Sequence, residues 1–279
     1  MRHLSFLPAA TVAWNGKKGN LSATYLRRIW RPSIDYLNPE IYYISEESKI
    51  KGNPSLKPQY ANRFTLAYAR QIRNGYLNMQ VSYERTKDMV DQVYIEDYTT
   101  TTYQNAGRSR MFSATGSYYL PLLKNMLTLN LSAGVTHQSL KLTPSMQASS
   151  LSTGNEGWIF NSSMNVSYMA PRNWFFNLSG TYISRIIAMN YTTRLKPTLD
   201  LLARKSLWKG RIDLSIRYTD MFGLWHRQRT DYRLKGVYQH SEVSLPSSML
   251  SFSVTWHFGT NFRSRNAGSA INNEDITIK

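Results

Sequence analysis

The sequence contains no cysteine among its 279 residues, so neither a disulfide nor a thiolate metal site can form. Charged residues make up 18% of the chain, which is below the value of about 25% that is usual for soluble domains. The chain also lacks the run of about 18 apolar residues that a membrane-spanning helix needs. These absences exclude a disulfide scaffold and argue against both a helical membrane protein and an ordinary soluble domain.

Aromatic residues, by contrast, make up 13% of the chain, yet the mean hydropathy is only −0.44. Low charge, many aromatics and moderate polarity are together typical of a barrel with one face in lipid and the other in water. Residues 4–14 do not form a signal peptide, because Pro8 interrupts them. Since a barrel of this kind needs export, we expect a further region to precede this sequence.

The formal net charge of +17 first suggests a nucleic-acid-binding protein. The basic residues are scattered, however, and the sequence shows no basic helix, zinc site or RNA-recognition motif, so we expect no nucleic-acid partner. Three uses of the charge stay open. A basic rim could meet lipopolysaccharide phosphates, a basic lumen could attract an anionic solute, or an acidic plug outside this sequence could balance it.

Strict alternation of apolar and polar residues predicts β-strands along most of the chain. In residues 127–135 the odd positions are Leu, Leu, Leu, Ala and Val, and the even positions are Thr, Asn, Ser and Gly. Residues 212–218 show the same period of two. The polar positions carry small neutral residues, which favours a lumen over the charged surface of a soluble sheet. A soluble β-sandwich or propeller is the alternative, but no blade-type repeat is visible.

The pattern predicts eleven strands, at about residues 6–15, 20–31, 61–72, 76–95, 102–120, 126–140, 157–169, 174–185, 193–206, 211–222 and 246–258. Short turns such as Arg73-Asn74-Gly75 alternate with longer polar connections over 32–60, 97–108, 141–156, 186–192 and 223–247. Aromatics such as Trp174 and Trp208 lie beside the short turns, as expected for an interfacial girdle.

An odd strand count has a consequence for closure. Bacterial single-chain barrels have an even number of strands, and eleven strands would start and end with strands of the same direction. The count therefore matches the last half of a larger barrel. A miscount by one would instead permit a complete twelve-stranded barrel.

Residues 28–70 contain an Arg-Pro, a Leu-Asn-Pro and a Gly-Asn-Pro-Ser-Leu-Lys-Pro segment between two alternating stretches. Pro54 and Pro58 fix φ there, whereas Gly52 and Asn53 permit tight turning. This layout resembles TonB-dependent outer-membrane receptors, and most closely the Bacteroidetes-type outer membrane protein β-barrel family. The residues that carry the resemblance are Arg31, Pro32, Leu37, Asn38, Pro39, Gly52, Asn53, Pro54, Leu56 and Pro58.

The resemblance implies an all-β fold, a transmembrane antiparallel β-barrel whose strands here resemble the C-terminal half of a 22-stranded barrel. Residues 1–259 would form the barrel portion, and residues 260–279 a polar periplasmic tail. Residues 196–223 resemble a late hairpin of the family, with an Asp before an aromatic at Asp220-Met221-Phe222. The closing strand would carry the assembly signal at Trp256 and Phe258, read by the barrel-assembly machinery.

The function that the resemblance implies is import of a scarce nutrient, a siderophore, glycan or peptide, across the bacterial outer membrane. The TonB complex would supply energy through an N-terminal region outside this sequence, and lipid and lipopolysaccharide would surround the barrel. Side chains expected to face the lumen and to contact plug or solute are Asn161, Ser163, Asn165, Asn177, Asp213 and Arg217.

The sequence offers little for catalysis. None of the five histidines has metal-ligand spacing, and no nucleophile elbow, P-loop or dinucleotide motif occurs, so we expect no catalytic residue, metal or cofactor. A small complete barrel could instead act in surface binding or adhesion through loops 32–60 and 223–247. A less favoured alternative is an outer-membrane hydrolase that uses His226, His240 and Asp231 together with serines of the outer loops.

Overall fold

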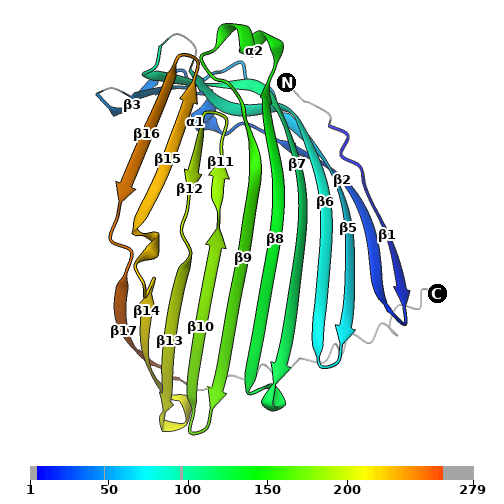
Figure 1. Ribbon diagram of the computed structural model, residues 1–279, viewed down its shortest axis with the longest axis vertical. Helices are drawn as coiled ribbons and strands as arrows, with labels where there is room; N and C mark the ends of the chain where they lie inside the picture. Colours follow the sequence, from blue (N-terminus) through cyan, green and yellow to red (C-terminus); the bar gives the residue numbers. More distant parts are fainter. Residues whose placement is uncertain (1–4, 47, 95–96, 260–279) are drawn as a thin grey trace, which may run out of the picture.

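The computed structural model describes residues 5–46, 48–94 and 97–259. Its main sheet contains thirteen strands, and eleven of them form a single antiparallel path that matches the number of strands predicted and confirms the all-β class (Figure 1). The path follows the chain in the order β1 (Ala9–Gly16), β2 (Gly19–Trp30), β5 (Gln59–Ile72), β6 (Gly75–Tyr94), β7 (Thr100–Leu122), β8 (Leu127–Leu142), β9 (Asn155–Ala170), β10 (Trp174–Ile183), β13 (Thr198–Leu207), β14 (Ile212–Thr219) and β17 (Met249–Trp256).

Tight turns join the strands at one end of the sheet, which we call the turn end; the opposite end, with the longer connections, is the loop end (Figure 1). The turn residues Arg73, Lys124, Arg172 and Lys209 all have positive φ. Such backbone angles match the right-handed twist of two paired strands, which is why tight hairpins select them. The short connections therefore stand where the sequence predicts them.

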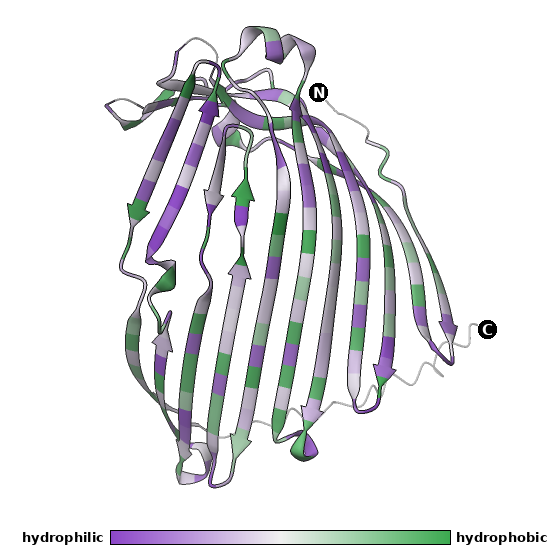
Figure 2. Cartoon of the chain, in the orientation of Figure 1, coloured by the Kyte–Doolittle hydropathy of each residue, from purple (hydrophilic) through white to green (hydrophobic). Residues whose placement is uncertain are grey.

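The two faces of the sheet differ in polarity. Leu131 on β8 lies opposite Tyr118 on β7 and Met164 on β9, so these three side chains share one face. Asn161 and Ser163 alternate with Met164 and take the other face. Figure 2 shows the resulting bands of apolar and polar residues along the strands. Many apolar side chains are exposed; Phe160, for instance, is 51% exposed. Such exposure is expected of a surface that faces lipid.

A second, four-stranded sheet continues the wall at the loop end (Figure 1). It contains β11 (Arg185–Ile187), β12 (Tyr191–Arg194), β15 (Arg227–Leu234) and β16 (Val237–Ser244). Each strand prolongs one member of the main sheet after a break, so β11 follows β10 and β16 precedes β17. The connections expected at 186–192 and 223–247 are therefore largely two hairpins, because the alternation of the wall resumes beyond the breaks.

Asp220 holds the break between β14 and β15. Its side chain is buried, with 2% exposure, and its carboxylate accepts hydrogen bonds from the backbone N–H groups of Leu224 at 3.2 Å and Trp225 at 3.1 Å and from the hydroxyl of Ser247. The backbone N–H of Asp220 donates to Asp200 Oδ1 at 2.8 Å. One side chain thus ties the 3-10 turn at Leu224–His226 to the segment that leads into β17.

The other loops carry short elements of their own. The connection at 32–60 contains the helical turn α1 (Ile34–Leu37) and the hairpin β3 (Ile41–Ser45) and β4 (Ser48–Lys51), and β4 pairs in parallel with β7. The helix α2 (Pro144–Ser149) follows β8. The connection expected at 97–108 overlaps the strand expected at 102–120. The strand occupies most of this overlap, because β7 starts at Thr100.

A small apolar core lies at the loop end and consists of Val93, Ala106, Leu140, Leu142, Ile187 and Met189. Beside it, Asn190 Nδ2 donates to the carbonyl oxygen of Gln92 at 2.8 Å. This bond joins β6 to the β11–β12 hairpin, although β7, β8 and β9 lie between them in the sheet. The wall therefore curves around the core, and the polar face that carries Leu140 is the concave one.

The barrel is open, since among the described residues β1 and β17 stand at the two ends of the strand path and do not pair. Open edges in lipid leave backbone groups without partners, which is costly. In the same part of the chain, no helix is long and apolar enough to span a membrane. The predicted tail at 260–279 lies outside the described residues.

Candidate functional site

The Gly52–Pro58 segment packs on the loop that precedes it. A Cβ atom on Gly52 would come within 2.0 Å of the carbonyl oxygen of Asn38, so only glycine fits there. Asn38 belongs to the Leu-Asn-Pro of the same pattern, and its Oδ1 accepts the N–H of Glu40 at 3.2 Å. Close backbone contact, rather than a positive φ, accounts for this glycine.

Asn53 then fastens the segment to strand β7. Its Nδ2 donates to the carbonyl oxygen of Tyr103 at 3.0 Å, and its Oδ1 accepts the N–H of Ser55 at 2.9 Å. The Tyr103 ring stacks on Tyr36 of α1, with centroids 4.0 Å apart. A second clamp lies close by, where Lys57 N donates to Asn105 Oδ1 at 2.8 Å. The Gly52–Pro58 segment therefore holds the preceding loop against β7 at the loop end.

The residues expected to face the lumen share the polar face by register. Asn177 lies opposite Ser167, and its Nδ2 donates to Ser167 Oγ at 2.9 Å and to Asn165 Oδ1 at 3.2 Å. Asp213 hydrogen-bonds with Ser206 and lies 3.2 Å from His257 Nε2. The full set on this face is Asn161, Ser163, Asn165, Asn177, Asp213 and Arg217. Contact of these residues with plug or solute stays a prediction.

A row of basic side chains crosses the four-stranded sheet. Arg185 on β11 lies opposite Arg194 on β12, Arg194 lies opposite Arg229 on β15, and Arg229 lies opposite Glu242 on β16. We call Arg185, Arg194 and Arg229 the arginine row. Gly157, on the polar face of β9, lies directly beside Arg185, so the row continues that concave face.

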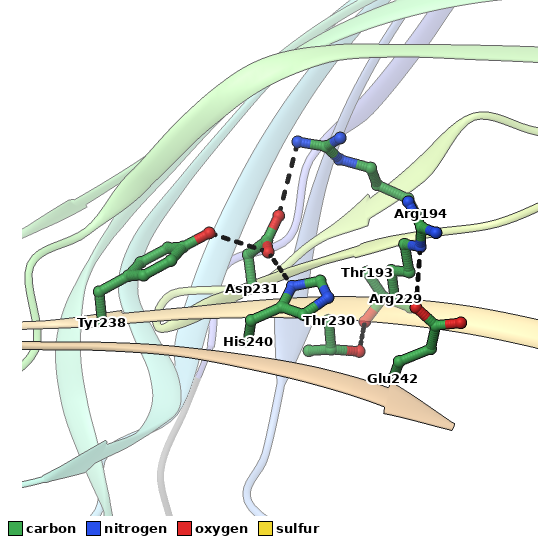
Figure 3. Close-up of polar contacts among 8 residues, drawn as sticks. All are labelled: Thr193, Arg194, Arg229, Thr230, Asp231, Tyr238, His240 and Glu242. Carbon is green, nitrogen blue, oxygen red and sulfur yellow. Dashed lines mark hydrogen bonds and ion pairs between the residues drawn. The ribbon is translucent and has the colours of Figure 1, made fainter. Parts of the chain in front are cut away.

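The arginine row lines a hollow of about 930 Å³ at the break, together with Lys196 and Arg227. Glu242 is the acidic partner in the row and lies 3.1 Å from Arg229 (Figure 3). It also lies 3.8 Å from Arg227. The Nε atom of Arg185 is buried and has no hydrogen-bond partner among the described residues. Five cations stand against two carboxylates, Glu242 and Asp231, of which Asp231 lies 3.5 Å from Arg194, so the hollow keeps a net positive charge that favours an anionic occupant.

Asp231 forms a polar cluster next to the row (Figure 3). Its carboxylate lies 2.8 Å from His240 Nδ1 and 3.5 Å from Arg194 Nη2, and it accepts the hydroxyl of Tyr238 at 3.0 Å. The hydrogen bond with His240 is the main cause that lowers the pKa of Asp231, and Tyr238 and Arg194 add to it. The same contact with Asp231 raises the pKa of Tyr238.

This cluster bears on the hydrolase alternative. The structure brings Asp231 and His240 together, but His226 contacts the carbonyl oxygen of Gly223 instead. The cluster of Asp231, His240, Tyr238 and Arg194 contains no serine, the nucleophile that a hydrolase of this kind needs. Within the described residues, no group of three or more His, Asp or Glu side chains is arranged to hold a metal ion.

Trp256 and Phe258, the residues expected to carry the assembly signal, lie at the turn end of the last strand. Trp256 ends β17, and its ring meets that of Phe258 edge to face with centroids 6.3 Å apart. Both side chains are exposed, at 68% and 87%. Their role in assembly stays a prediction.

Comparison with known families decides the membership of the chain. The sequence matches the outer membrane protein beta-barrel family over residues 2–256. The chain belongs to this family. Its place is therefore the bacterial outer membrane, with the turn end toward the periplasm and the loop end toward the outside. No curated protein matches the sequence.

Solved structures show the same fold in TonB-dependent receptors. The FrpB iron transporter from Neisseria meningitidis matches with a TM-score of 0.58 and 14% identity, over 90% of this chain and 38% of that one. The siderophore receptor PirA from Pseudomonas aeruginosa gives 0.59 and 12%, over 86% and 42%. The ferric enterobactin receptor PfeA of the same organism gives 0.58 and 13%, over 90% and 40%. The family member described here thus spans about two fifths of their length.

The sequence does not predict the arginine row, because residues 223–247 have the polar composition of a loop. A signal was available: in Arg227–Leu234 the charged residues Arg227, Arg229, Asp231 and Arg233 alternate with uncharged ones, which is the period of a strand. The neighbouring cations on β11 and β12 could not be aligned with them without the strand register.

Proposed function

We propose that this family member is the C-terminal barrel segment of a TonB-dependent outer-membrane receptor that imports a scarce anionic nutrient. Three features support the segment assignment. The chain covers about two fifths of receptors with the same fold, its strand number is odd, and its two edge strands lie open where a completed barrel would pair them.

The arginine row is the feature that indicates the chemical class of the ligand. Arg185, Arg194 and Arg229 lie on the concave face at the extracellular end, in a hollow that a solute entering the lumen would meet first. Guanidinium groups bind carboxylates and other oxyanions in paired hydrogen bonds. Among siderophores, glycans and peptides, a ferric siderophore with net negative charge suits this lining best. The names of FrpB, PirA and PfeA, an iron transporter and two siderophore receptors, point the same way.

Uptake by cells tests this function. Cells carrying the full-length protein should accumulate iron from an anionic ferric siderophore, and a protonophore that collapses the proton-motive force should abolish this. Replacing Arg185 and Arg229 by Gln should reduce uptake about tenfold or more, since each charge-assisted bond contributes roughly 1.5–3 kcal/mol. Lys18→Gln, an exposed change in the periplasmic turn between β1 and β2, is the matched control and should leave uptake unchanged.

Each part of the proposal can fail separately. Uptake that persists with the protonophore would exclude TonB coupling and favour passive binding or adhesion. Wild-type uptake by the double arginine variant would remove the arginine row from the ligand site. Import of neutral glycans but not of ferric siderophores would exclude the anionic class.

A further inference from the structure

An aromatic row crosses the apolar face toward the loop end. Neighbouring strands pair its members directly: Phe64 opposite Tyr83, Tyr83 opposite Phe112, and Phe112 opposite His137. From β2 to β9 the row is Tyr25, Phe64, Tyr83, Phe112, His137 and Trp158. Aromatic rows of this kind lie at the boundary between lipid and water.

The height of the row fits that boundary. Along β8, Leu127 at the turn end and His137 in the row are ten residues apart. With a rise of about 3.4 Å per residue and a strand tilt of about 40°, this corresponds to about 25 Å across the membrane, the usual height of the apolar band. The aromatic row therefore marks the extracellular interface.

A band of cations follows directly above the aromatic row. Arg85 on β6 lies opposite Arg110 on β7, and each is two residues closer to the loop end than Tyr83 and Phe112. Two residues farther toward the loop end, Arg108 on β7 lies opposite Lys141 on β8. Lys87 follows Arg85 on the same face of β6. We call Arg85, Lys87, Arg108, Arg110 and Lys141 the cationic band. Two strand residues span about 7 Å, so these side chains stand at the level of lipid headgroups.

The cationic band lacks internal partners. Within the described residues, none of its five side chains takes part in an ion pair, and the Nε atom of Arg85 is buried without a hydrogen-bond acceptor. Four of the five line one hollow of about 840 Å³, with Asp88 and Glu156 as its acidic members. The hydroxyl of Ser139 hydrogen-bonds to Glu156 at 3.2 Å. The band keeps a net charge of several units.

A groove on the same face lies below the aromatic row. Small side chains line up in register there, with Gly116 opposite Ala133 and Ala133 opposite Ser162. Leu131 and Met164 complete an almost wholly apolar hollow of about 700 Å³. An acyl chain fits such an apolar surface. A single lipid could therefore bind with its phosphates in the cationic band and its acyl chain in the groove.

We propose that the cationic band is a binding site for the phosphorylated head of lipopolysaccharide in the outer leaflet. Arginine and lysine groups bind phosphate through charge-assisted hydrogen bonds, and basic surfaces beside membrane spans bind anionic headgroups. The site is on the lipid side of the wall, separate from the arginine row, so it does not depend on the transported solute.

Lipid retention by the full-length protein tests the site. The purified protein would be placed in nanodiscs with lipid A, dephosphorylated lipid A or phosphatidylglycerol, and bound lipid would be counted by native mass spectrometry. We expect retention of lipid A only. The exposed changes Arg108→Gln and Lys141→Gln should together lower it about 25-fold, that is about fivefold for each cation at a membrane surface.

The control is Lys17→Gln with Lys18→Gln, which removes the same charge at the periplasmic turn and should leave retention unchanged. Heat-modifiable migration would show that each variant is folded; should the double variant not fold, Lys141→Gln alone is expected to lose about fivefold. Undiminished lipid A retention in the folded variants would overturn the site. Equal retention of dephosphorylated lipid A or of phosphatidylglycerol would overturn its assignment to lipopolysaccharide phosphate.

Discussion

The side-chain amide of Asn53 donates a hydrogen bond to the carbonyl oxygen of Tyr103, fifty residues farther along the chain. This bond joins the loop after β2 to strand β7, with Tyr36 stacked on Tyr103 beside it. A pattern that reads in sequence as turn chemistry therefore acts over long range. It fixes the position of the loop end above the barrel wall.

The first prediction concerns Gly52. Gly52→Ala would bring a Cβ atom within 2.0 Å of the carbonyl oxygen of Asn38, so the loop must leave its place on β7. We expect a loss of about 2 kcal/mol in local stability, comparable to other buried backbone conflicts. Limited proteolysis of the full-length protein should show faster cleavage within residues 32–58.

Gly116→Ala is the matched control for this change, because its Cβ would meet only the carbonyl oxygen of Asn78, at 4.0 Å. It should leave the cleavage rate as in the wild type. Equal protection of the loop in Gly52→Ala would show that the close contact with Asn38 is not needed.

A second prediction addresses the break at Asp220. Asp220→Asn keeps the size of the side chain but replaces one acceptor oxygen by an N–H₂ group, which faces the donor Leu224 N if it takes the place of Oδ1 and the donor Trp225 N if it takes the place of Oδ2. A buried donor without an acceptor costs about 1–3 kcal/mol. Hydrogen exchange in residues 223–248 should therefore become faster, while the exposed change Asp35→Asn should have no effect there. Unchanged exchange in Asp220→Asn would mean that the break is held by other contacts.

The third prediction is a pH dependence of the four-stranded sheet. The hydrogen bond with His240, with help from Tyr238 and Arg194, holds the pKa of Asp231 below its ordinary value of 3.8. A lowered pKa contributes stability above 3.8 that is lost as the pH falls through the folded-state pKa. The protection factors of the amides in β15 and β16, which correct for the intrinsic exchange rate at each pH, should fall below about pH 4. In Asp231→Asn that acid step should be absent; its persistence would assign the step to another group.

A fourth prediction separates the two faces of the wall. Since the chain has no cysteine, a single one can be labelled without background. Ser163→Cys on the polar face should react with a hydrophilic maleimide in outer membranes, whereas Met164→Cys on the apolar face should react at least about tenfold more slowly. Denatured samples of both variants should label equally. Faster labelling at position 164 would reverse the assignment of lipid and lumen.

The sequence predicted the strands well, because each carries its own alternation. In residues 127–135 leucines at every second position both specify the strand and assign its faces, and the structure pairs those leucines with the apolar positions of β7 and β9. The positions of the short turns were equally clear, since Gly and Asn are concentrated there, although Arg73, Lys124, Arg172 and Lys209 also take positive φ. The eleven strands of the antiparallel path could be counted on these grounds alone.

The site was harder to predict, because it depends on register between strands that are distant in sequence. Arg185, Arg194 and Arg229 become neighbours only after β11, β12 and β15 pair. The aromatic row and the cationic band arise in the same way. Asp220 was visible as part of a family pattern, but its role follows from contacts with Leu224, Trp225 and Ser247 that no spacing rule encodes.

The size of the native polypeptide tests the central claim most directly. An antibody against residues 260–279 would be used to probe outer-membrane fractions. If the chain is the C-terminal part of a TonB-dependent receptor, the band should migrate at more than twice the 32.2 kDa of this chain, as the coverage of the solved receptors implies. A folded, heat-modifiable band at 32.2 kDa would mean a small barrel complete in itself and would contradict the receptor account.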